Sequence, residues 1–446
     1  MTTRSCAAFA VLASLVAACS SSSGGTTKTV GDSGTQGTPD AHHATSDSAT
    51  SKDAGGGAPD ATPDVTSSTS DASDAGTGAS EAAADAGAEA APFVPIDAGG
   101  GPITGTTAQT WNWVPFPDAK CRDGSTTGLG VNLNPASPNV LIYLEGGGAC
   151  FNFATCAGNP SSFGAPDFAM RFPTDGDGGA PESGNVILDR TNTANPVADW
   201  NFIYVPYCTG DIHAGNNVGV MINDVVGPQS FVGYQNVNLY LERLVPTFAA
   251  STHVVLTGIS GGGFGAAANY EHVRRAFGSI PVDLIDDSGP FMEDPYLPAC
   301  LQNEVRALWG LDSTVGVDCG GDCSNDPTFF IDFAKHILTQ NPQRQFGLMD
   351  SLGDQTITAF FGFGASDCAG FAQETATTFT AGLNDIRTHL SAETNLSTFY
   401  FAGTDHTSLG DDNFYTRTTT TADGGVINLP TWVADVVGGK TNVAGP

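Results

Sequence analysis

The chain has 446 residues, and its 16 lysines and arginines stand against 47 aspartates and glutamates, which gives a net charge of −31. No basic stripe is present that could follow a phosphate backbone, so the composition excludes a nucleic-acid-binding protein. The same acidity disfavours polyanionic substrates, because like charges repel them over long range.

The first 19 residues are typical of a lipoprotein signal peptide. Arg4 supplies the positive start, and an apolar stretch over residues 6–17 follows, which is too short to span a bilayer. Small residues precede Cys19, so we expect cleavage there and a diacylglycerol on the Cys19 sulfur. The mature protein would then be an outer-membrane or cell-surface lipoprotein. Cleavage at an ordinary signal-peptidase site would instead make it a secreted protein.

Two regions of different composition follow the signal peptide. Residues 20–105 are rich in Ser, Thr, Gly, Ala, Asp and Pro, with 12 acidic residues and two lysines. Such a stretch cannot bury enough apolar surface to offset the entropy of ordering, so we predict a disordered linker. Residues 106–446 have a globular composition, and roughly 340 residues is an ordinary length for a single α/β domain.

Eight cysteines remain after Cys6 in the signal peptide and Cys19 at the predicted anchor. An even number in an exported protein favours disulfides, and we expect Cys150 and Cys156 to form a local one. Cys319 and Cys323 lack the second pair of ligands that a zinc site needs, so disulfide bonding is favoured for them as well, and the other pairings stay open. No residue pattern calls for a metal or a cofactor.

Apolar, β-branched runs predict the strands in chain order. Two short antiparallel edge strands are expected at 111–117 and 129–134, then buried strands at 139–145, 200–206, 253–259, 281–287, 345–349 and 398–402. Helices are predicted at 231–248, after residue 260, and at 327–340 and 373–393, while 157–198 and 300–326 are expected to be irregular. Apolar strands that alternate with helices predict an α/β fold with a mainly parallel sheet. Active residues of such sheets collect at the carboxyl ends of the strands.

The stretch Gly258-Ile-Ser-Gly-Gly262 is the one G-x-S-x-G in the sequence. It follows an apolar strand and precedes an Ala-rich helical segment. A sharp strand-to-helix turn there would expose the side chain of Ser260 at the top of the sheet as a nucleophile. The alternative is a glycine-rich turn with a surface serine.

A serine hydroxyl needs a histidine to take its proton and a carboxylate to orient that histidine, in the chain order Ser, Asp or Glu, His. His406 follows the last predicted strand in a loop of small residues. The other histidines after Ser260 fall inside predicted helices, namely His272, His336 and His389. The acid is expected after the preceding strand, which leaves Asp350 and Asp354. Asp354 is preferred because it lies in the loop, whereas Asp350 can still belong to the strand.

Backbone donors for an oxyanion are expected at two places. One is the N–H of Gly261, directly after the predicted nucleophile. The other is the loop Gly146-Gly147-Gly148, which follows a buried strand. The alternative is a flexible turn, while a phosphate-binding loop is disfavoured because no Lys-Ser/Thr pair follows.

Several segments resemble the pectin acetylesterase and Notum family in the same order along the chain. Residues 144–152, Leu-Glu-Gly-Gly-Gly-Ala-Cys-Phe-Asn, are similar to the family signature Glu-Gly-Gly-Trp-x-Cys-Phe-Asn, and 206–215 to its Pro-Tyr-Cys-x-x-Asp segment. Residues 258–263 match its nucleophile turn, and 287–289 its Asp-Ser-Gly segment. The resemblance implies an α/β-hydrolase fold and a serine esterase whose catalytic and oxyanion residues are Ser260, Asp354, His406, Gly147, Gly148 and Gly261.

Two departures from the family pattern stand out: Gly148 replaces the tryptophan of the signature, and the region around Asp354 matches poorly. The resemblance suggests removal of an acetyl or other acyl group from a polysaccharide or glycoconjugate. Because the domain is acidic, we expect a neutral acylated glycan or a small ester rather than polyanionic pectin. Alternatives are a non-catalytic glycan-binding lipoprotein and a serine peptidase on the same fold. We expect a monomer that meets the membrane only through its lipid anchor.

Overall fold

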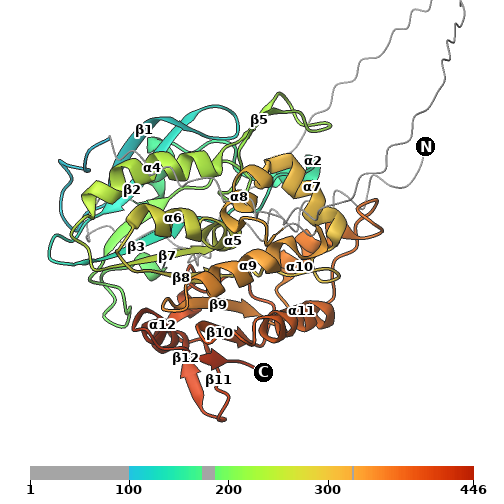
Figure 1. The fold of residues 1–446 in the computed structure, drawn as a ribbon. Helices are drawn as coiled ribbons and strands as arrows, with labels where there is room; N and C mark the ends of the chain where they lie inside the picture. Colours follow the sequence, from blue (N-terminus) through green and yellow to red (C-terminus); the bar gives the residue numbers. More distant parts are fainter. Residues whose placement is uncertain (1–99, 173–185, 324–325) are drawn as a thin grey trace, which may run out of the picture. The chain divides into compact units, whose positions relative to one another are not determined.

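The computed structural model describes residues 100–172, 186–323 and 326–446 (Figure 1). The predicted signal peptide, the lipidation site Cys19 and nearly all of the predicted linker lie outside these residues. Within the described part of the chain, no helix is long and apolar enough to cross a bilayer.

A nine-stranded sheet organises the described residues, in the strand order β1-β2-β4-β3-β7-β8-β9-β10-β13. Its strands are β1 (Asn112–Lys120), β2 (Thr126–Asn132), β3 (Asn139–Leu144), β4 (Asn201–Val205), β7 (His253–Ile259), β8 (Val282–Asp287), β9 (Phe346–Ser351), β10 (Leu396–Phe401) and β13 (Val443–Ala444). In this order, all pairings from β4 to β13 are parallel. At the other side of the sheet, β1 pairs with β2 and β2 pairs with β4, both antiparallel. The predicted mainly parallel sheet is therefore confirmed.

Helices cover the sheet, and loops connect them to its strands (Figure 1). They are α2 (Phe153–Gly158), α3 (Ala165–Arg171), α4 (Gly233–Thr247), α5 (Gly261–Ala268), α6 (Tyr270–Phe277), α7 (Ala299–Trp309), α8 (Val315–Cys319), α9 (Phe329–Gln340), α10 (Gln355–Phe361), α11 (Ala376–His389) and α12 (Leu429–Val437). Two small hairpins lie outside the main sheet, β5 (Asn217–Val220) with β6 (Gln229–Phe231) and β11 (Thr418–Thr420) with β12 (Val426–Asn428).

Alternation along the buried strands divides the core between the two faces of the sheet. In β3, Val140, Ile142 and Leu144 belong to one hydrophobic cluster, which includes residues of α4, α6, α9 and α11. Leu141 and Tyr143 belong to the other cluster, which includes residues of α3 and α12. A strand with both faces covered must be apolar at nearly every position, which is why β3, β4 and β7 read as continuous apolar runs.

The prediction of irregular structure over 300–326 is wrong, because α7 and α8 occupy most of it. Leu301, Val305 and Trp309 recur every four residues and form the buried face of α7, and Gly310 ends the helix in the left-handed conformation (φ 71°). The frequent Gly, Asp and Cys residues just after this helix obscure that period. Part of the region predicted as loop at 157–198 is likewise the helix α3, and the sheet continues past β10 to β13.

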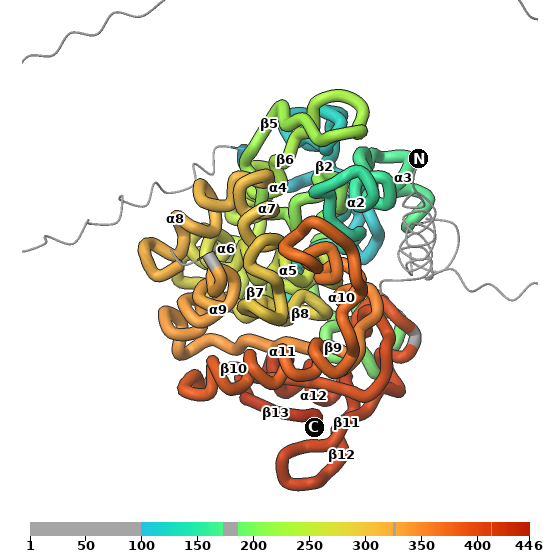
Figure 2. Tube along the Cα trace, turned by 90° about the vertical axis from the view of Figure 1, so that its right-hand side faces the viewer, coloured from blue at the N-terminus to red at the C-terminus, as the bar shows by residue number. Residues whose placement is uncertain are grey.

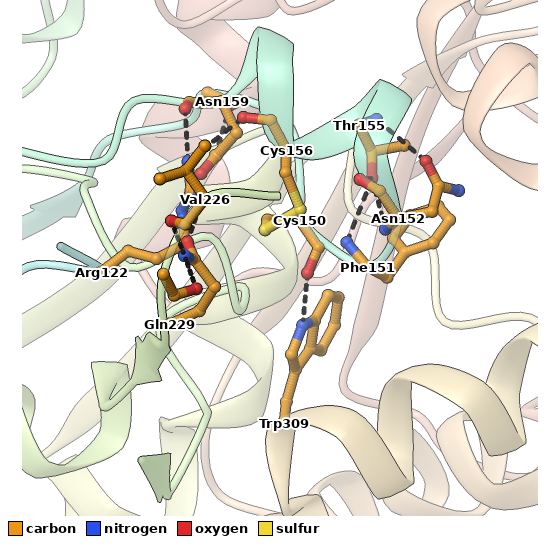
Figure 3. The surroundings of a disulfide bond; sticks show 12 residues. Arg122, Cys150, Phe151, Asn152, Thr155, Cys156, Asn159, Val226, Gln229 and Trp309 are labelled. Atoms are coloured by element: carbon orange, nitrogen blue, oxygen red, sulfur yellow. Dashed lines mark hydrogen bonds between the residues drawn. A yellow bond between two sulfur atoms is a disulfide. The ribbon is translucent and has the colours of Figure 1, made fainter. Parts of the chain in front are cut away.

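All eight cysteines of the described region are paired, as Cys121–Cys208, Cys150–Cys156, Cys300–Cys368 and Cys319–Cys323. The predicted pair Cys150–Cys156 is confirmed, and it holds the loop after β3 onto α2 (Figure 3). Around it, Arg122 donates to the carbonyls of Cys156 and Asn159, and the indole N–H of Trp309 donates to Cys150 O (2.9 Å). Disulfides in this number are typical of proteins that fold in an oxidising compartment.

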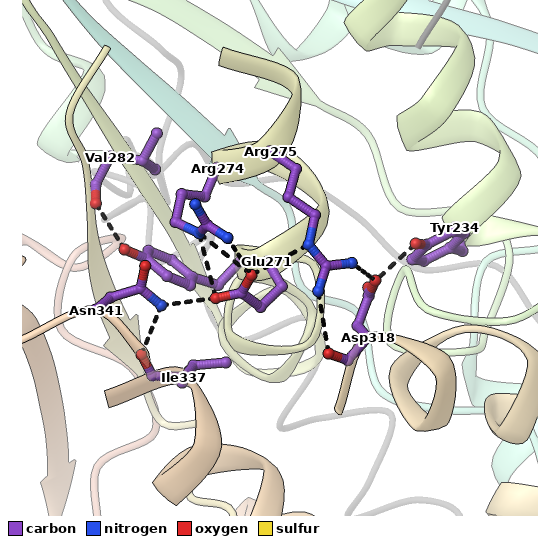
Figure 4. Close-up of polar contacts among 9 residues, drawn as sticks. Tyr234, Glu271, Arg274, Arg275, Val282, Asp318, Ile337 and Asn341 are labelled. Carbon is purple, nitrogen blue, oxygen red and sulfur yellow. Dashed lines mark hydrogen bonds and ion pairs between the residues drawn. The ribbon is translucent and has the colours of Figure 1, made fainter. Parts of the chain in front are cut away.

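A buried ion network fastens α6 to its neighbours (Figure 4). Glu271 is 1% exposed and meets both Arg274 (2.7 Å) and Arg275 (3.3 Å), and its other oxygen accepts from Asn341 (2.6 Å). Arg275 also pairs with Asp318 of α8 (2.6 Å). Each buried carboxylate in this network is thus met by a guanidinium, which fixes the helix layer on that face of the sheet.

Candidate active site

Ser260 occupies the sharp turn between β7 and α5. Its backbone has φ 55° and ψ −126°, a conformation that non-glycine residues rarely adopt and that stores strain. The Ser260 N–H donates to the carbonyl of Asp287 at the end of the neighbouring strand β8 (2.8 Å). The turn therefore fixes the hydroxyl of Ser260 at the carboxyl edge of the sheet, where it lines a cavity.

Close backbone approach explains the two outer glycines of the G-x-S-x-G segment. A Cβ on Gly258 would lie 2.1 Å from Gly262 O, and a Cβ on Gly262 would lie 2.1 Å from Leu144 O. Neither contact is possible for a real side chain. Glycine at both positions is therefore a geometric requirement of the turn that presents Ser260.

His406 and Asp354 are brought together from the loops after β10 and β9. His406 Nδ1 donates to Asp354 Oδ2 at 2.7 Å, and the His406 side chain is 13% exposed. The other oxygen of Asp354 caps α10 by accepting from the N–H groups of Thr356 and Ile357, both at 2.8 Å. Asp354 is completely buried, so both of its oxygens are held in place.

Asp350, the other acid considered, lies within β9 and accepts no hydrogen bond on either carboxylate oxygen among the described residues. Burial, together with the nearby charges of Asp354 and Asp287, raises its pKa well above the ordinary value, which disfavours its charged form. The geometry thus pairs His406 with Asp354 and leaves Asp350 beneath them.

Opposing effects set the pKa of His406. Burial is the largest effect and lowers it, but the charge of Asp354, its hydrogen bond and the charge of Asp287 together raise the pKa above its ordinary value. No hydrogen bond between the Ser260 hydroxyl and His406 occurs in this part of the structure. Such contacts are often long in unliganded enzymes and tighten when substrate binds.

The glycine loop after β3 lies directly against the Ser260 turn. A Cβ on Gly146 would be 2.9 Å from Ser260 Cβ, and a Cβ on Gly261 would be 2.7 Å from Gly148 O. Within the described residues, the N–H groups of Gly147 and Gly148 donate no hydrogen bond. Gly261 opens α5, where a first-turn N–H has no partner inside the helix. Unpaired N–H groups thus flank Ser260 from two segments.

Two buried polar residues that the sequence did not single out support this loop. The carboxylate of Glu145 accepts from Tyr207 N (3.0 Å) and pairs with Arg171 (2.6 Å). The carbonyl of Glu145 accepts from His213 Nε2 (2.8 Å). Burial lowers the pKa of His213 to about 4, so its imidazole is neutral at physiological pH. The segment 206–215 therefore fixes the loop that carries the free N–H groups.

Asp287 is a third residue of the site that sequence reasoning left without a role. Besides accepting from Ser260 N through its carbonyl, it accepts from Ser408 N (2.7 Å) and Leu409 N (2.6 Å) through its carboxylate. It thereby links the turn of Ser260 to the loop of His406. Its position at the end of a buried strand was the signal in the sequence, but its partner lies 121 residues further along the chain.

An apolar cavity of about 80 Å³ opens beside Ser260. Figures 1 and 2 show α7 and α10 on the same side of the sheet, and both helices supply its walls. Its lining is Gly148, Ala149, Phe151, Ile212, Ser260, Gly261, Phe264, Leu297, Leu301, Val305, Trp309, Phe330, Ile357, Phe360 and Phe361. Apart from Ser260 and the glycine backbone, the residues that line the cavity are apolar. The cavity therefore suits an apolar group.

One group of metal-ligand types occurs among the described residues, formed by Glu293, Asp385 and His389. None of the three lines the cavity or contacts Ser260, His406 or Asp354.

Known proteins resemble this chain over part of the site. The family model described as Pectinacetylesterase matches residues 114–314, a range that includes Ser260 and the glycine loop but not Asp354 or His406. The Notum palmitoleoyl-protein carboxylesterase of Drosophila melanogaster is 28% identical over 205 residues, which are 43% of this chain and 29% of that protein. Its human counterpart is 27% identical over 183 residues, 39% of this chain and 34% of that protein.

The matched region therefore spans about a third of the length of these relatives. A crystal structure of the Wnt deacylase Notum from Drosophila superposes with a TM-score of 0.53 and 19% identity, and covers 75% of this chain and 96% of that one. This likeness shows the fold, an α/β hydrolase. Over residues 114–314, which include the strand, the turn and the glycine loop around Ser260, the chain is similar to the pectin acetylesterase and Notum family.

Proposed function

We propose that the protein is a serine carboxylesterase in which Ser260 is the nucleophile, His406 the general base and Asp354 the residue that orients the base. The observation that carries the proposal is the hydrogen bond of His406 Nδ1 to Asp354, at the same edge of the sheet as the strained turn of Ser260. Because Nδ1 donates to the carboxylate, Nε2 is the free acceptor that the serine proton needs.

The reaction follows from these roles. Ser260 Oγ attacks the ester carbonyl carbon while its proton passes to His406 Nε2, and the imidazolium is stabilised by Asp354. The oxyanion forms within reach of the N–H groups of Gly147, Gly148 and Gly261. His406 then protonates the departing alcohol, which leaves an acyl-serine. Water, deprotonated by His406, releases the carboxylic acid and restores the serine.

The apolar cavity is the proposed place of the acyl group. Its about 80 Å³ is small beside the roughly 300–1,000 Å³ of pockets that hold drug-sized ligands, so it favours a short acyl group such as acetyl. Charged or strongly polar acyl groups would lose their hydration against Phe151, Phe264 and Trp309 without gaining a partner. The net charge of −31 further favours a neutral acylated glycan or a small ester over a polyanion.

Trp309 supplies an indole side chain to the cavity wall in place of the tryptophan that is absent at position 148. The signature of the family has a tryptophan where this chain has Gly148, which has no side chain. Trp309 lines the same cavity from α7, and its N–H is fixed on Cys150 O, two residues after Gly148. We expect Trp309 to limit the depth of the acyl site.

One relative favours a second candidate, a non-catalytic glycan-binding lipoprotein. A zebrafish Notum protein described as inactive is 29% identical over 99 residues, which are 22% of this chain. The two candidates differ in turnover. Hydrolysis of p-nitrophenyl acetate, butyrate, octanoate and palmitate, beside the matched acetanilide, supports the esterase if acetate is turned over fastest and the amide is not. A folded protein without turnover on any ester supports the binding protein.

Export as a monomeric lipoprotein is part of the proposal, with the membrane contacted only through a lipid on Cys19. The four disulfides agree with an oxidising compartment. Expression of wild type and Cys19→Ser in a Gram-negative host, followed by membrane fractionation, separates the possibilities. Wild type in the membrane fraction and the variant in the soluble fraction support the anchor, and an equal distribution contradicts it.

A further inference from the structure

Asp287 ends β8 between the strand that carries Ser260 and the strand that leads to Asp354. It pairs with Ile259 of β7 on one side and with Met349 of β9 on the other. Its carbonyl accepts from Ser260 N (2.8 Å), so the backbone of Asp287 holds the strained nucleophile turn. No other residue of the site touches both neighbouring strands at this edge in the described sheet.

The carboxylate of Asp287 holds the opposite side of the site. Its Oδ2 accepts from the consecutive N–H groups of Ser408 and Leu409, two and three residues after His406, and Oδ1 accepts from Ser288 Oγ (3.0 Å). Successive N–H groups of this kind form a concave site for an anion. Ser351 Oγ donates to the carbonyl of Asp405 (2.8 Å), so hydrogen bonds hold the loop on both sides of His406.

No arginine or lysine neutralises this buried carboxylate among the described residues. The titratable groups that face it are Asp286 on its own strand, Asp350 of β9, Tyr143 of β3 and His406. Burial raises the pKa of Asp286, Asp350 and Tyr143 well above their ordinary values. Burial also raises the pKa of Asp287, but the hydrogen bonds from Leu409 N, Ser408 N and Ser288 Oγ and the charge of His406 act against that rise and favour its charged form. His406 is faced by Asp354 and Asp287.

We propose that Asp287 is a positioning residue for the reaction, which holds the Ser260 turn and the His406 loop in register and supplies a second negative charge to the imidazolium. The inference rests on the proposed esterase function. Asp287 does not touch His406, so it acts through the main chain of Ser408 and Leu409 and through its charge. Asp354 orients the imidazole ring, and Asp287 places the loop that carries it.

The variant Asp287→Asn tests the charge alone. The amide oxygen can still accept from Ser408 N and Leu409 N, and its NH₂ can donate to Ser288 Oγ, so these hydrogen bonds are kept while the charge is lost. Because the Asp287 charge raises the pKa of His406, its removal lowers that pKa. The acid limb of the kcat/KM profile should therefore move to lower pH than in wild type.

The variant Asp287→Ala tests the hydrogen bonds to the loop of His406. Two buried N–H groups lose their acceptor, the loop of His406 is released, and kcat should fall by roughly 100-fold while KM stays nearly unchanged. Asp283→Asn is the matched control, since Asp283 is a buried carboxylate at the other end of the same strand, bonded to His253 and Gln345 N. It should leave the pH profile of turnover in its wild-type place.

The outcomes separate the two proposals. If wild type and Asp283→Asn turn over p-nitrophenyl acetate and Asp287→Asn moves the acid limb to lower pH, the positioning role is supported. If Asp287→Asn is folded and active with an unmoved acid limb, and Asp287→Ala keeps its kcat, that role is overturned while the esterase stands. If wild type itself neither turns over esters nor reacts with a serine probe, the proposed function and the inference fall together.

Discussion

Two buried polar regions of this molecule follow opposite rules. In the network around Glu271, each carboxylate is met by an arginine within ion-pair distance (Figure 4). At the carboxyl edge of the sheet, Asp287, Asp350 and Asp354 lie near one another, and no arginine or lysine pairs with any of them in the described residues. In the first region, the carboxylates are already paired with cations in the resting protein. In the second region, the cation that the carboxylates stabilise is the imidazolium of His406, which forms only during the proposed reaction.

The largest expected effect removes the nucleophile at that edge. Ser260→Ala should lower kcat by roughly a millionfold, because the remaining groups act only through Ser260 Oγ. Ester turnover of purified protein, with circular dichroism to show an unchanged fold, measures the effect. Turnover above a trace in the pure variant would contradict the role of Ser260.

A smaller loss is expected from the acid that orients the base. Asp354→Asn should lower kcat roughly 10⁴-fold, because an amide in this place favours the wrong tautomer of His406. Asp350→Asn is the matched control, since Asp350 is a buried carboxyl of the preceding strand that makes no hydrogen bond to His406 in the described structure. Equal losses in the two variants would mean that the hydrogen bond to Asp354 does not define the triad acid.

A substitution in the ion network around Glu271 should lower the stability of the fold and leave ester turnover unchanged. Glu271→Gln leaves Arg274 and Arg275 short of their partner and should lower the free energy of unfolding by about 3 kcal/mol. Arg274, Asn341 and Arg275 outweigh the larger effect of burial and lower the pKa of Glu271, so its contribution is present at neutral pH and is lost as the pH falls through that lowered pKa. Urea unfolding at pH 7 and at acidic pH should show the difference between variant and wild type shrinking on acidification. A change of kcat per folded molecule would show that the two regions are coupled.

Strain at the turn predicts a gain in stability from a loss of function. Ser260→Gly relieves a backbone conformation that only glycine adopts freely, so it should be more stable than Ser260→Ala by about 1–2 kcal/mol. Thermal unfolding of the two inactive variants measures the difference, and alanine serves as the control for the lost hydroxyl. Equal melting temperatures would mean that the turn stores no strain.

The smallest expected effect is a shift in the pH at which kcat/KM of the wild-type protein begins to rise. The base must be neutral to accept the serine proton, so kcat/KM should rise with pH through the raised pKa of His406, above the ordinary histidine value. The same raised pKa means that this pair stabilises the fold fully below the unfolded-state pKa and loses that contribution as the pH rises through the folded one. A midpoint below the ordinary value would show that burial outweighs the two carboxylates.

The sequence predicted the features of this site that are local. Strand periods, the glycines of the Ser260 turn and the loop position of His406 can all be read within ten residues of each group. The role of Asp287 depends on a contact with residues 408–409, and the choice between Asp354 and Asp350 depends on where β9 ends, which neighbouring residues do not define. The helix α7 was missed because the Gly- and Cys-rich segment after it hides its four-residue period.

The most direct test of the account is intact-protein mass spectrometry after treatment with a fluorophosphonate, with wild type, Ser260→Ala and Asp354→Asn side by side. The account predicts one adduct on wild type that maps to Ser260, none on Ser260→Ala, and a much slower adduct on Asp354→Asn. A folded wild-type protein that acquires no adduct, or one that is labelled equally when Ser260 is replaced, would contradict an activated serine at this turn.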